Sequence, residues 1–233
     1  MKLEELIDKY GLKLSDQAVR TCNDGLNRMR RSQDPAHGDR HVEDIFALLD
    51  AFLRESKEVK KEEIDFEVLL AAICWHDIWK ARRPMSTNFF KFKFDQYWDG
   101  IGSARVFNKY ARANNLPMPT VKKIRYAVLR HNSLFFSIKK FAGNRDHIEA
   151  RLVDDLDSLE FWSMKRLEYL TSAYLDENNK FYNSRLIPLA DWTLNKFAQK
   201  VTSFSFRWSA EEFSRRKDAV LKRGQEIMEI NKP

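Results

Sequence analysis

Glycine and proline are scarce in this chain of 233 residues, which has seven glycines and six prolines. β-Sheets depend on turns, and turns rely on these two residue types, so their scarcity argues against an all-β protein and favours helices. Long apolar stretches are lacking as well. The most apolar run, residues 66–75, is too short to span a bilayer and contains Glu67. We therefore expect no membrane-spanning helix.

Cysteine is equally rare. Cys22 and Cys74 lie in segments with a helical pattern, which predicts reduced core residues rather than a disulfide framework. The opening residues, MKLEELIDKYGL, lack the apolar core of a signal peptide and predict an amphipathic helix. Together these features predict a cytoplasmic protein.

The chain carries a net charge of +7, while 43% of its residues are hydrophobic and 32% are charged. This balance is typical of a globular protein. An excess of positive charge favours anionic partners such as nucleotides, nucleic acid or phosphorylated metabolites. A basic surface that is merely well solvated explains the charge equally well.

The apolar residues follow a helical period in most of the chain. Val42, Ile45, Phe46, Leu49 and Phe52 recur at the spacing of one buried stripe. Residues 66–80 are apolar on nearly all sides, which predicts the central helix of an all-α bundle. Further helices are expected at residues 17–31, 102–114, 119–131, 146–174 and 209–230, the last opened by a capping box at Ser209 and Glu212.

Residues 81–100 differ from the rest, because they mix aromatic with basic side chains and show no clean period. Arg82 and Arg83 could pair with phosphates while neighbouring aromatic rings stack on a base, which makes this segment the best candidate for substrate recognition. The alternative, which we favour, is that these aromatic rings close the bundle and the basic side chains lie in solvent.

The five histidines all lie between His37 and His147, and one of them forms the pair His76–Asp77. A buried carboxylate is costly unless it is paired, and a divalent cation bound by both side chains would pair it. Lys80 lies one turn after His76 on the predicted helix, so its ammonium could meet a phosphate oxygen. Imidazole and carboxylate together suit a borderline divalent cation that activates water.

The order of these groups resembles the signature of the HD superfamily of metal-dependent phosphohydrolases: a histidine, a His-Asp pair and a distant aspartate. DPAHGDRHVEDI resembles the first motif, AAICWHDIWK the second, and RLVDDLDSLEFW the helix with the final aspartate. SARVFNKYARANNLP and IRYAVLRHNS resemble the helix pair in between. The resemblance covers roughly residues 20–170. It implies an HD-type helical bundle in residues 1–175, with a helical C-terminal extension, residues 176–233, packed on the same domain.

The resemblance also implies one divalent metal ion. Mixed nitrogen and oxygen ligands admit Mn, Fe, Co, Ni, Zn or Mg. The final aspartate is ambiguous: the better alignment gives Asp154, Asp157 is its competitor, and Asp155 is third. The implied metal ligands are His41, His76, Asp77 and Asp154.

For catalysis, the resemblance implies that Asp77 orients the attacking water and that His131 donates a proton or binds phosphate. His37 lines the site or joins a second metal. One metal is preferred, because Asn132 follows His131 where some two-metal relatives carry another histidine. The expected catalytic residues are Asp77, His131 and Lys80, and the expected substrate-binding residues are Lys80, Arg82, Arg83 and His37.

The chain departs from the family pattern at two positions besides the ambiguous aspartate. Asp44 stands where the first motif usually has an arginine, and Trp79 replaces the glycine of H-D-I-G-K. A tryptophan at this position would narrow the mouth of the site.

The sequence therefore predicts a metal-dependent phosphohydrolase that acts on a nucleotide or another small phosphorylated metabolite through a metal-activated water. The alternative is a catalytically inactive HD-like module that binds a nucleotide or nucleic acid and regulates a partner. A basic helical protein that binds nucleic acid without metal ranks last, because no helix-turn-helix signature is present.

Overall fold

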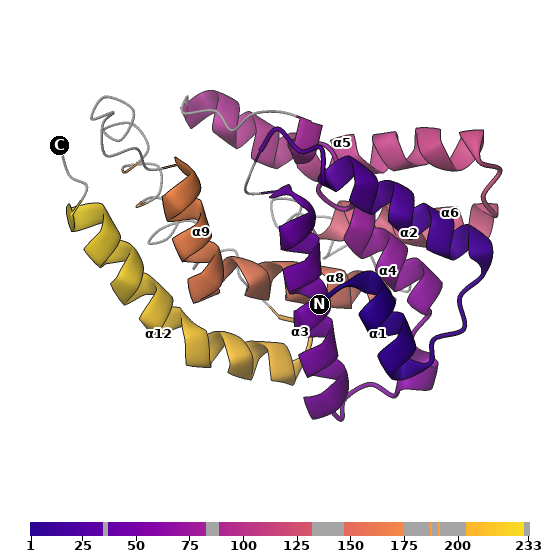
Figure 1. Ribbon diagram of the computed structural model, residues 1–233, viewed down its shortest axis with the longest axis horizontal. Coiled ribbons are helices and arrows are strands. Elements are labelled where there is room, and N and C mark those ends of the chain that lie inside the picture. The colour runs from indigo at the N-terminus through magenta and orange to yellow at the C-terminus, as the bar shows by residue number, and fades with distance from the viewer. Residues whose placement is uncertain are drawn as a thin grey trace.

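The computed structural model describes residues 1–34, 37–82, 89–131, 147–174 and 204–230 and the single positions 187 and 191, without the side chains at 89, 90, 92, 93, 96, 97, 173 and 174. The predicted all-α fold is confirmed, because these parts hold nine α-helices and no strand (Figure 1). The helices are α1 (Leu3–Tyr10), α2 (Asp16–Met29), α3 (Asp39–Glu55), α4 (Phe66–Trp75), α5 (Phe89–Ala113), α6 (Met118–Arg130), α8 (Ile148–Phe161), α9 (Met164–Tyr174) and α12 (Arg207–Ile230).

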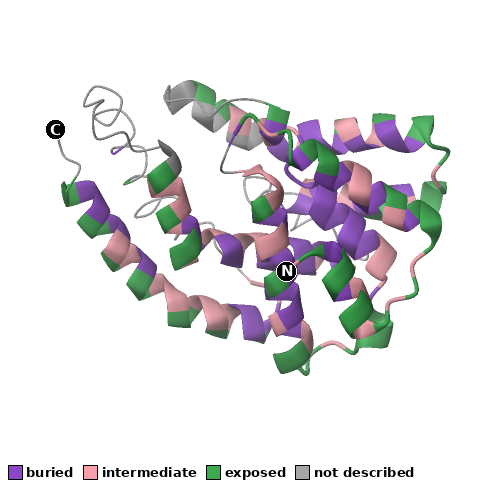
Figure 2. Cartoon of the chain, in the orientation of Figure 1, coloured by how far each residue is buried: buried purple, intermediate pink, exposed green. Residues whose placement is uncertain are grey.

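Helix α4 is the centre of the bundle, as its apolar sequence predicts. It begins after Asp65, whose side chain accepts a hydrogen bond from the backbone N–H of Val68. Every residue from Val68 to the end of the helix is buried (Figure 2). Helices α2, α6 and α8 pack around it. A helix surrounded in this way needs apolar side chains on all faces, which explains its lack of a polar stripe.

Helices α2 and α4 approach closely at Gly25. A Cβ atom at this position would lie 2.8 Å from the backbone oxygen of Cys74, so only glycine fits without a shift. The indole nitrogen of Trp75 also donates to the backbone oxygen of Thr21 at 2.9 Å. Cys22 and Cys74 are both buried and free, in agreement with the expected reduced thiols. These contacts fix the end of α4, where the His-Asp pair follows.

Helix α3 confirms the predicted apolar stripe, since all five of its members are buried. The stripe packs α3 against α8 and α1. His41 lies in the first turn of α3 and is buried as well. The helix therefore directs this imidazole into the bundle.

Helix α5 begins at Phe89, so the expectation that residues 81–100 lack a regular helix is wrong for its second half. The buried face of α5 carries Asp99 and Ser103, which lie four residues apart. A helix is predicted from apolar residues that recur at the helical period, and polar residues on the buried face interrupt that recurrence. Ser103 donates to Asp99 at 3.3 Å, so the two satisfy each other inside the protein.

One helix was expected over residues 146–174, but the described part, residues 147–174, forms two helices. Helix α8 ends at Phe161, and the hydroxyl of Ser163 accepts a hydrogen bond from the backbone N–H of Arg166 at the start of α9. Serine at this position satisfies one of the free N–H groups of a new helix. The chain therefore turns at Trp162 and Ser163.

Helix α12 begins at Arg207, two residues before the predicted capping box. The carboxylate of Glu58 accepts hydrogen bonds from the backbone N–H groups of Arg207 and Trp208, each at 2.9 Å. A side chain distant in sequence thus caps this helix, which a local motif cannot reveal. Helix α12 packs along α9, α8 and α3 at one edge of the molecule (Figure 1). Among the described helices, none combines the length and the apolar character needed to cross a membrane.

Candidate metal centre

The His-Asp pair lies at the end of α4 and not within a longer helix. The predicted helix over residues 66–80 ends at Trp75, and His76 is its C-terminal cap. The chain then forms a turn that contains Asp77, closed by a hydrogen bond from the N–H of Ala81 to the backbone oxygen of Asp77 at 3.0 Å. Adjacent side chains on an α-helix point about 100° apart. Leaving the helix here lets two neighbouring side chains face one point.

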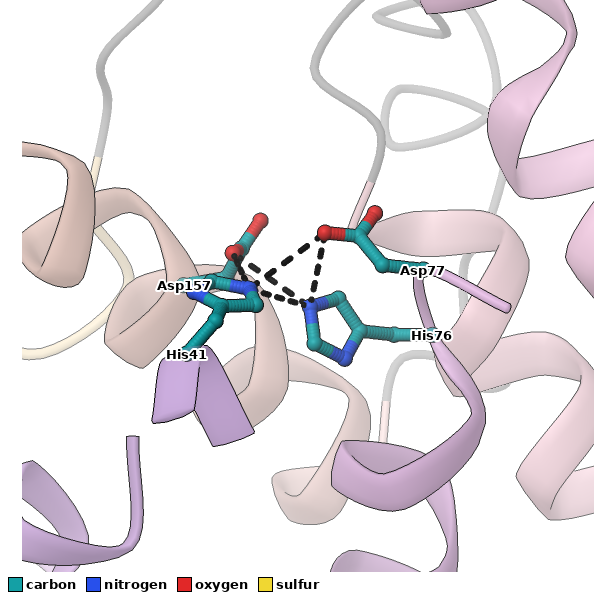
Figure 3. A group of neighbouring side chains, drawn as sticks. All are labelled: His41, His76, Asp77 and Asp157. Atoms are coloured by element: carbon teal, nitrogen blue, oxygen red, sulfur yellow. Dashed lines mark hydrogen bonds and ion pairs between the residues drawn. The ribbon is translucent and has the colours of Figure 1, made fainter. Parts of the chain in front are cut away.

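Four side chains converge on that point from three parts of the chain (Figure 3). The Nε2 atoms of His41 and His76 are 3.0 Å apart. Each lies 3.3 Å from Oδ2 of Asp77. Oδ1 of Asp157, on α8, lies 3.3 Å from Nε2 of His41 and 3.4 Å from Nε2 of His76. All four atoms lie within 4.8 Å of one another.

The Nδ1 atoms of His41 and His76 face away from the point where the four side chains converge. Nδ1 of His76 donates to the backbone oxygen of Ile73 at 2.7 Å. Nδ1 of His41 lies 2.9 Å from Oε2 of Glu160, a carboxylate that can only accept. A proton on each Nδ1 makes each Nε2 the atom available as a metal ligand. Two imidazole nitrogens and two carboxylate oxygens thus face one another.

The spacing of the four atoms fits a metal coordination sphere. Nitrogen and oxygen ligands lie about 2.0–2.2 Å from a transition metal ion, which puts neighbouring ligands about 3.0 Å apart in an octahedral sphere and about 3.4 Å apart in a tetrahedral one. The five separations that involve a histidine nitrogen, 3.0–3.4 Å, fall in this interval. The donor set also suits a borderline divalent ion. These His and Asp groups could therefore hold a metal ion.

Burial is uneven around the centre. The side chains of His41, His76 and Asp77 are 2%, 0% and 2% exposed, whereas that of Asp157 is 23% exposed. Asp157 is thus the member of the group that solvent reaches. Any small molecule that approaches the four ligand atoms would do so on the Asp157 side.

The electrostatics of the group favour positive charge. Burial by itself lowers the pKa of His41, but the carboxylates of Glu160, Asp157 and Asp77 outweigh it and raise this pKa well above the ordinary value. The pKa of His76 is raised mainly by the charge of Asp77, against the effect of burial. Burial raises the pKa of a carboxylate, yet the neighbouring cations hold the pKa values of Asp77 and Asp157 well below their ordinary range.

Lys80 and His131 contact the second oxygen of Asp77, Oδ1. The ammonium of Lys80 is 3.2 Å from Oδ1 of Asp77 and 3.1 Å from Oδ2 of Asp99. Nε2 of His131 lies 3.1 Å from the same oxygen of Asp99 and 3.5 Å from Oδ1 of Asp77. Although burial opposes it, these two carboxylates raise the pKa of His131 to about 10 and also raise the pKa of Lys80. Both side chains are therefore cationic at neutral pH.

The preference for Asp154 as the last ligand is corrected by the structure. Asp154 is buried against Arg130, with Oδ2 2.5 Å from Nη1. Asp155 accepts backbone N–H groups just before α12, at 2.9–3.1 Å, and burial together with the charge of Asp154 raises its pKa to about 7. Asp157, the competitor, is the aspartate that joins the two histidines. The three aspartates of one helix thus meet three different surroundings.

Among the remaining predicted residues, His37 lies beside the centre. Nδ1 of His37 is 2.8 Å from Oδ2 of Asp34, and its Nε2 is 3.7 Å from Oδ2 of Asp77, so this ring borders the metal group. Arg82 is exposed, and Arg83 lies outside the described residues. A role of either arginine in substrate binding stays a prediction.

Two residues near the centre were not predicted from the sequence. The carboxylate of Glu160 lies beside Nδ1 of His41. Glu160 follows Asp157 by three residues on α8, and this spacing indicates that the two side chains share one face of the helix. Asp99 pairs with Lys80 and His131. It would have been found only if α5 had been recognised over its full length.

Comparisons of the chain with protein-family models, with curated proteins and with solved structures found no match.

Proposed function

We propose that this chain is a metal-dependent phosphohydrolase of the HD type, which hydrolyses a phosphate ester of a nucleotide or of another small phosphorylated metabolite. The observation that carries the proposal is the convergence of Nε2 of His41, Nε2 of His76, Oδ2 of Asp77 and Oδ1 of Asp157 at the spacing of metal ligands. The histidine, the His-Asp pair and the later aspartate also follow the order of the HD signature.

A divalent ion held by these groups would lower the pKa of a water molecule and polarise a phosphoryl oxygen. Asp77 would orient that water, a role supported by its contacts with His76 through one carboxylate oxygen and with Lys80 through the other. The solvent-exposed edge at Asp157 is where the substrate would enter. Mn, Fe, Co, Ni, Zn and Mg all remain compatible with two nitrogen and two oxygen donors.

The chain supplies positive charge for a phosphoryl group. Lys80 and His131 are cationic and contact Oδ1 of Asp77, where they would offset negative charge that develops on the phosphate. A net charge of +7 further favours the approach of an anionic substrate.

The test is the metal content of the purified protein together with hydrolysis of a nucleotide panel in the presence of added Mn²⁺. The parent is compared with His76→Ala and Asp77→Ala. His147→Ala is the matched control, because His147 caps α8 and makes no contact with the four ligands. We expect metal and turnover in the parent and the control, and neither in the two site variants.

The other outcomes are equally informative. Bound metal without turnover on any substrate would contradict the hydrolase and favour the regulatory module. A parent that binds no divalent ion would contradict the metal centre itself.

A further inference from the structure

A second group of potential ligands lies directly beside the first. It consists of Oδ1 of Asp77, Oδ2 of Asp99 and Nε2 of His131, all within 4.8 Å of one another. The three residues are buried and come from the turn after α4, from α5 and from the end of α6. Nδ1 of His131 faces the backbone oxygen of Val128, so Nε2 is the atom that this ring offers to the group. His41 and His76 are oriented in the same manner.

The ammonium of Lys80 lies against this second group. It is 3.2 Å from Oδ1 of Asp77 and 3.1 Å from Oδ2 of Asp99, and the Lys80 side chain is only 15% exposed. Within the described residues, Oδ1 of Asp77 is buried and accepts no hydrogen bond of normal geometry. Its contacts are charge contacts with Lys80 and His131. This oxygen therefore faces cations, as a metal-ligating oxygen does.

The two oxygens of Asp77 divide between the two groups. Oδ2 faces His41 and His76, while Oδ1 faces Lys80 and His131. A carboxylate shared in this way bridges two cations, and two-metal hydrolytic sites place their ions about 3.5–4 Å apart. In this protein the second cation is an ammonium that belongs to the chain.

We propose that Asp77, Asp99 and His131 form a second divalent-metal position that Lys80 occupies and thereby blocks. The protein then binds one metal ion, and removal of the Lys80 charge opens the position to a second ion. The inference rests on the proposed function only in that the first position must bind a metal.

The experiment counts Mn²⁺ ions per chain, by metal analysis after equilibration with excess Mn²⁺, and records the EPR spectrum. We expect one ion per chain in the parent, with the spectrum of an isolated Mn²⁺. Lys80→Met should bind two ions per chain, and its spectrum should show magnetic coupling between them, because Asp77 would bridge the pair. The double variant Lys80→Met/Asp99→Asn should return to one ion, since the second position loses a carboxylate.

The parent measurement does not depend on the folding of any variant. Two ions per chain in the parent would overturn the inference, because Lys80 would then block nothing. One ion in a folded Lys80→Met chain would overturn it as well. A Lys80→Met chain that Mn²⁺ does not stabilise would also contradict it, because an ion in the second position neutralises the carboxylates that Lys80 leaves behind. A parent without bound Mn²⁺ would instead contradict the proposed function.

Discussion

Gly102 lies directly against the indole ring of Trp79, since a Cβ atom at position 102 would be 2.3 Å from a ring carbon. The backbone N–H of Trp79 donates to Oγ of Ser103 at 3.0 Å, and Ser103 donates to Asp99. Trp79 follows Asp77 by two residues. The contact thus joins the turn that carries one metal-ligand candidate to the helix that carries Asp99.

Gly102→Ala should lower the free energy of unfolding and weaken Mn²⁺ binding, because the indole ring must move and the turn with it. Overpacking costs about 1–3 kcal/mol, and the better helix propensity of alanine returns at most about 1 kcal/mol. Denaturant unfolding and Mn²⁺ titration measure the two effects. In a Trp79→Leu background the cost should shrink, because the smaller side chain leaves room. An equal cost in both backgrounds would show that the ring is not the cause.

Asp154 and Asp157 form a matched pair of test positions on α8. Asp157→Asn should abolish metal binding, because its carboxylate belongs to the candidate ligand group. Asp154→Asn should keep the metal and lower the free energy of unfolding by about 3 kcal/mol, because the buried Arg130 loses its counter-ion. Metal analysis and urea unfolding of both variants decide the assignment. The reverse pattern would restore Asp154 as the ligand.

Most of the metal group could be predicted from the sequence, because His41 follows a loop at a helix start and His76–Asp77 interrupts an apolar run. The last candidate ligand could not, because Asp154, Asp155 and Asp157 share one acidic run. Only the packing of α8 separates them, by placing Arg130 beside the first and the two histidines beside the third. Such long-range contacts leave no local pattern in the chain.

The bundle itself was largely predictable, since the stripe of α3 and the apolar α4 follow from hydrophobic spacing. The end of α4 at Trp75 was not predictable, because the sequence of residues 76–80 is compatible with a continued helix. The chain leaves the helix there, and the turn that follows directs the side chain of Asp77 toward the histidines. The first part of α5, residues 89–101, was not predicted as a helix, for a different reason. The buried face of α5 carries Asp99 and Ser103, so a helix that contributes polar groups near a site lacks the apolar period.

Removal of bound metal should lower the melting temperature of the parent. An ion that binds only the folded chain adds about 2.7 kcal/mol when its concentration is 100-fold above the dissociation constant. Thermal unfolding with excess Mn²⁺ and with a chelator measures the difference. The same comparison on Asp157→Asn should show no difference, and a shift that persists in this variant would place the stabilising ion elsewhere.

Glu160 should tune the metal affinity through His41, because its carboxylate faces the Nδ1 proton of that ring. Glu160→Gln keeps the shape but removes the charge, and loss of such a partner typically weakens metal binding 10- to 100-fold. We expect a roughly tenfold rise in the Mn²⁺ dissociation constant. Glu168→Gln, at an exposed position of α9, is the control. Equal affinities in the two variants would contradict a role for Glu160.

The surroundings of Asp50, outside the candidate metal centre, predict a dependence of the free energy of unfolding on pH. The Tyr10 hydroxyl donates to its Oδ1 at 2.7 Å, and Nζ of Lys9 lies 2.5 Å from the same oxygen. Burial alone would raise the pKa of Asp50, but these contacts outweigh it and lower the pKa. A depressed pKa means that the ionised form stabilises the fold. This contribution is complete above the pKa of the unfolded chain, about 3.9, and is lost as the pH falls through the folded value.

Asp50→Asn should therefore lower the free energy of unfolding by about 2 kcal/mol at pH 7, since a hydrogen bond to a charged group contributes about 1.5–3 kcal/mol and the half-exposed Lys9 contributes less. The difference between parent and variant should shrink as the pH falls below about 4, because Asp50 is then neutral in the parent as well. Urea unfolding between pH 3 and pH 7 measures it, with Asp8→Asn, at an exposed position of α1, as control. A difference that stays constant over this interval would show that Asp50 contributes through packing and not through its charge.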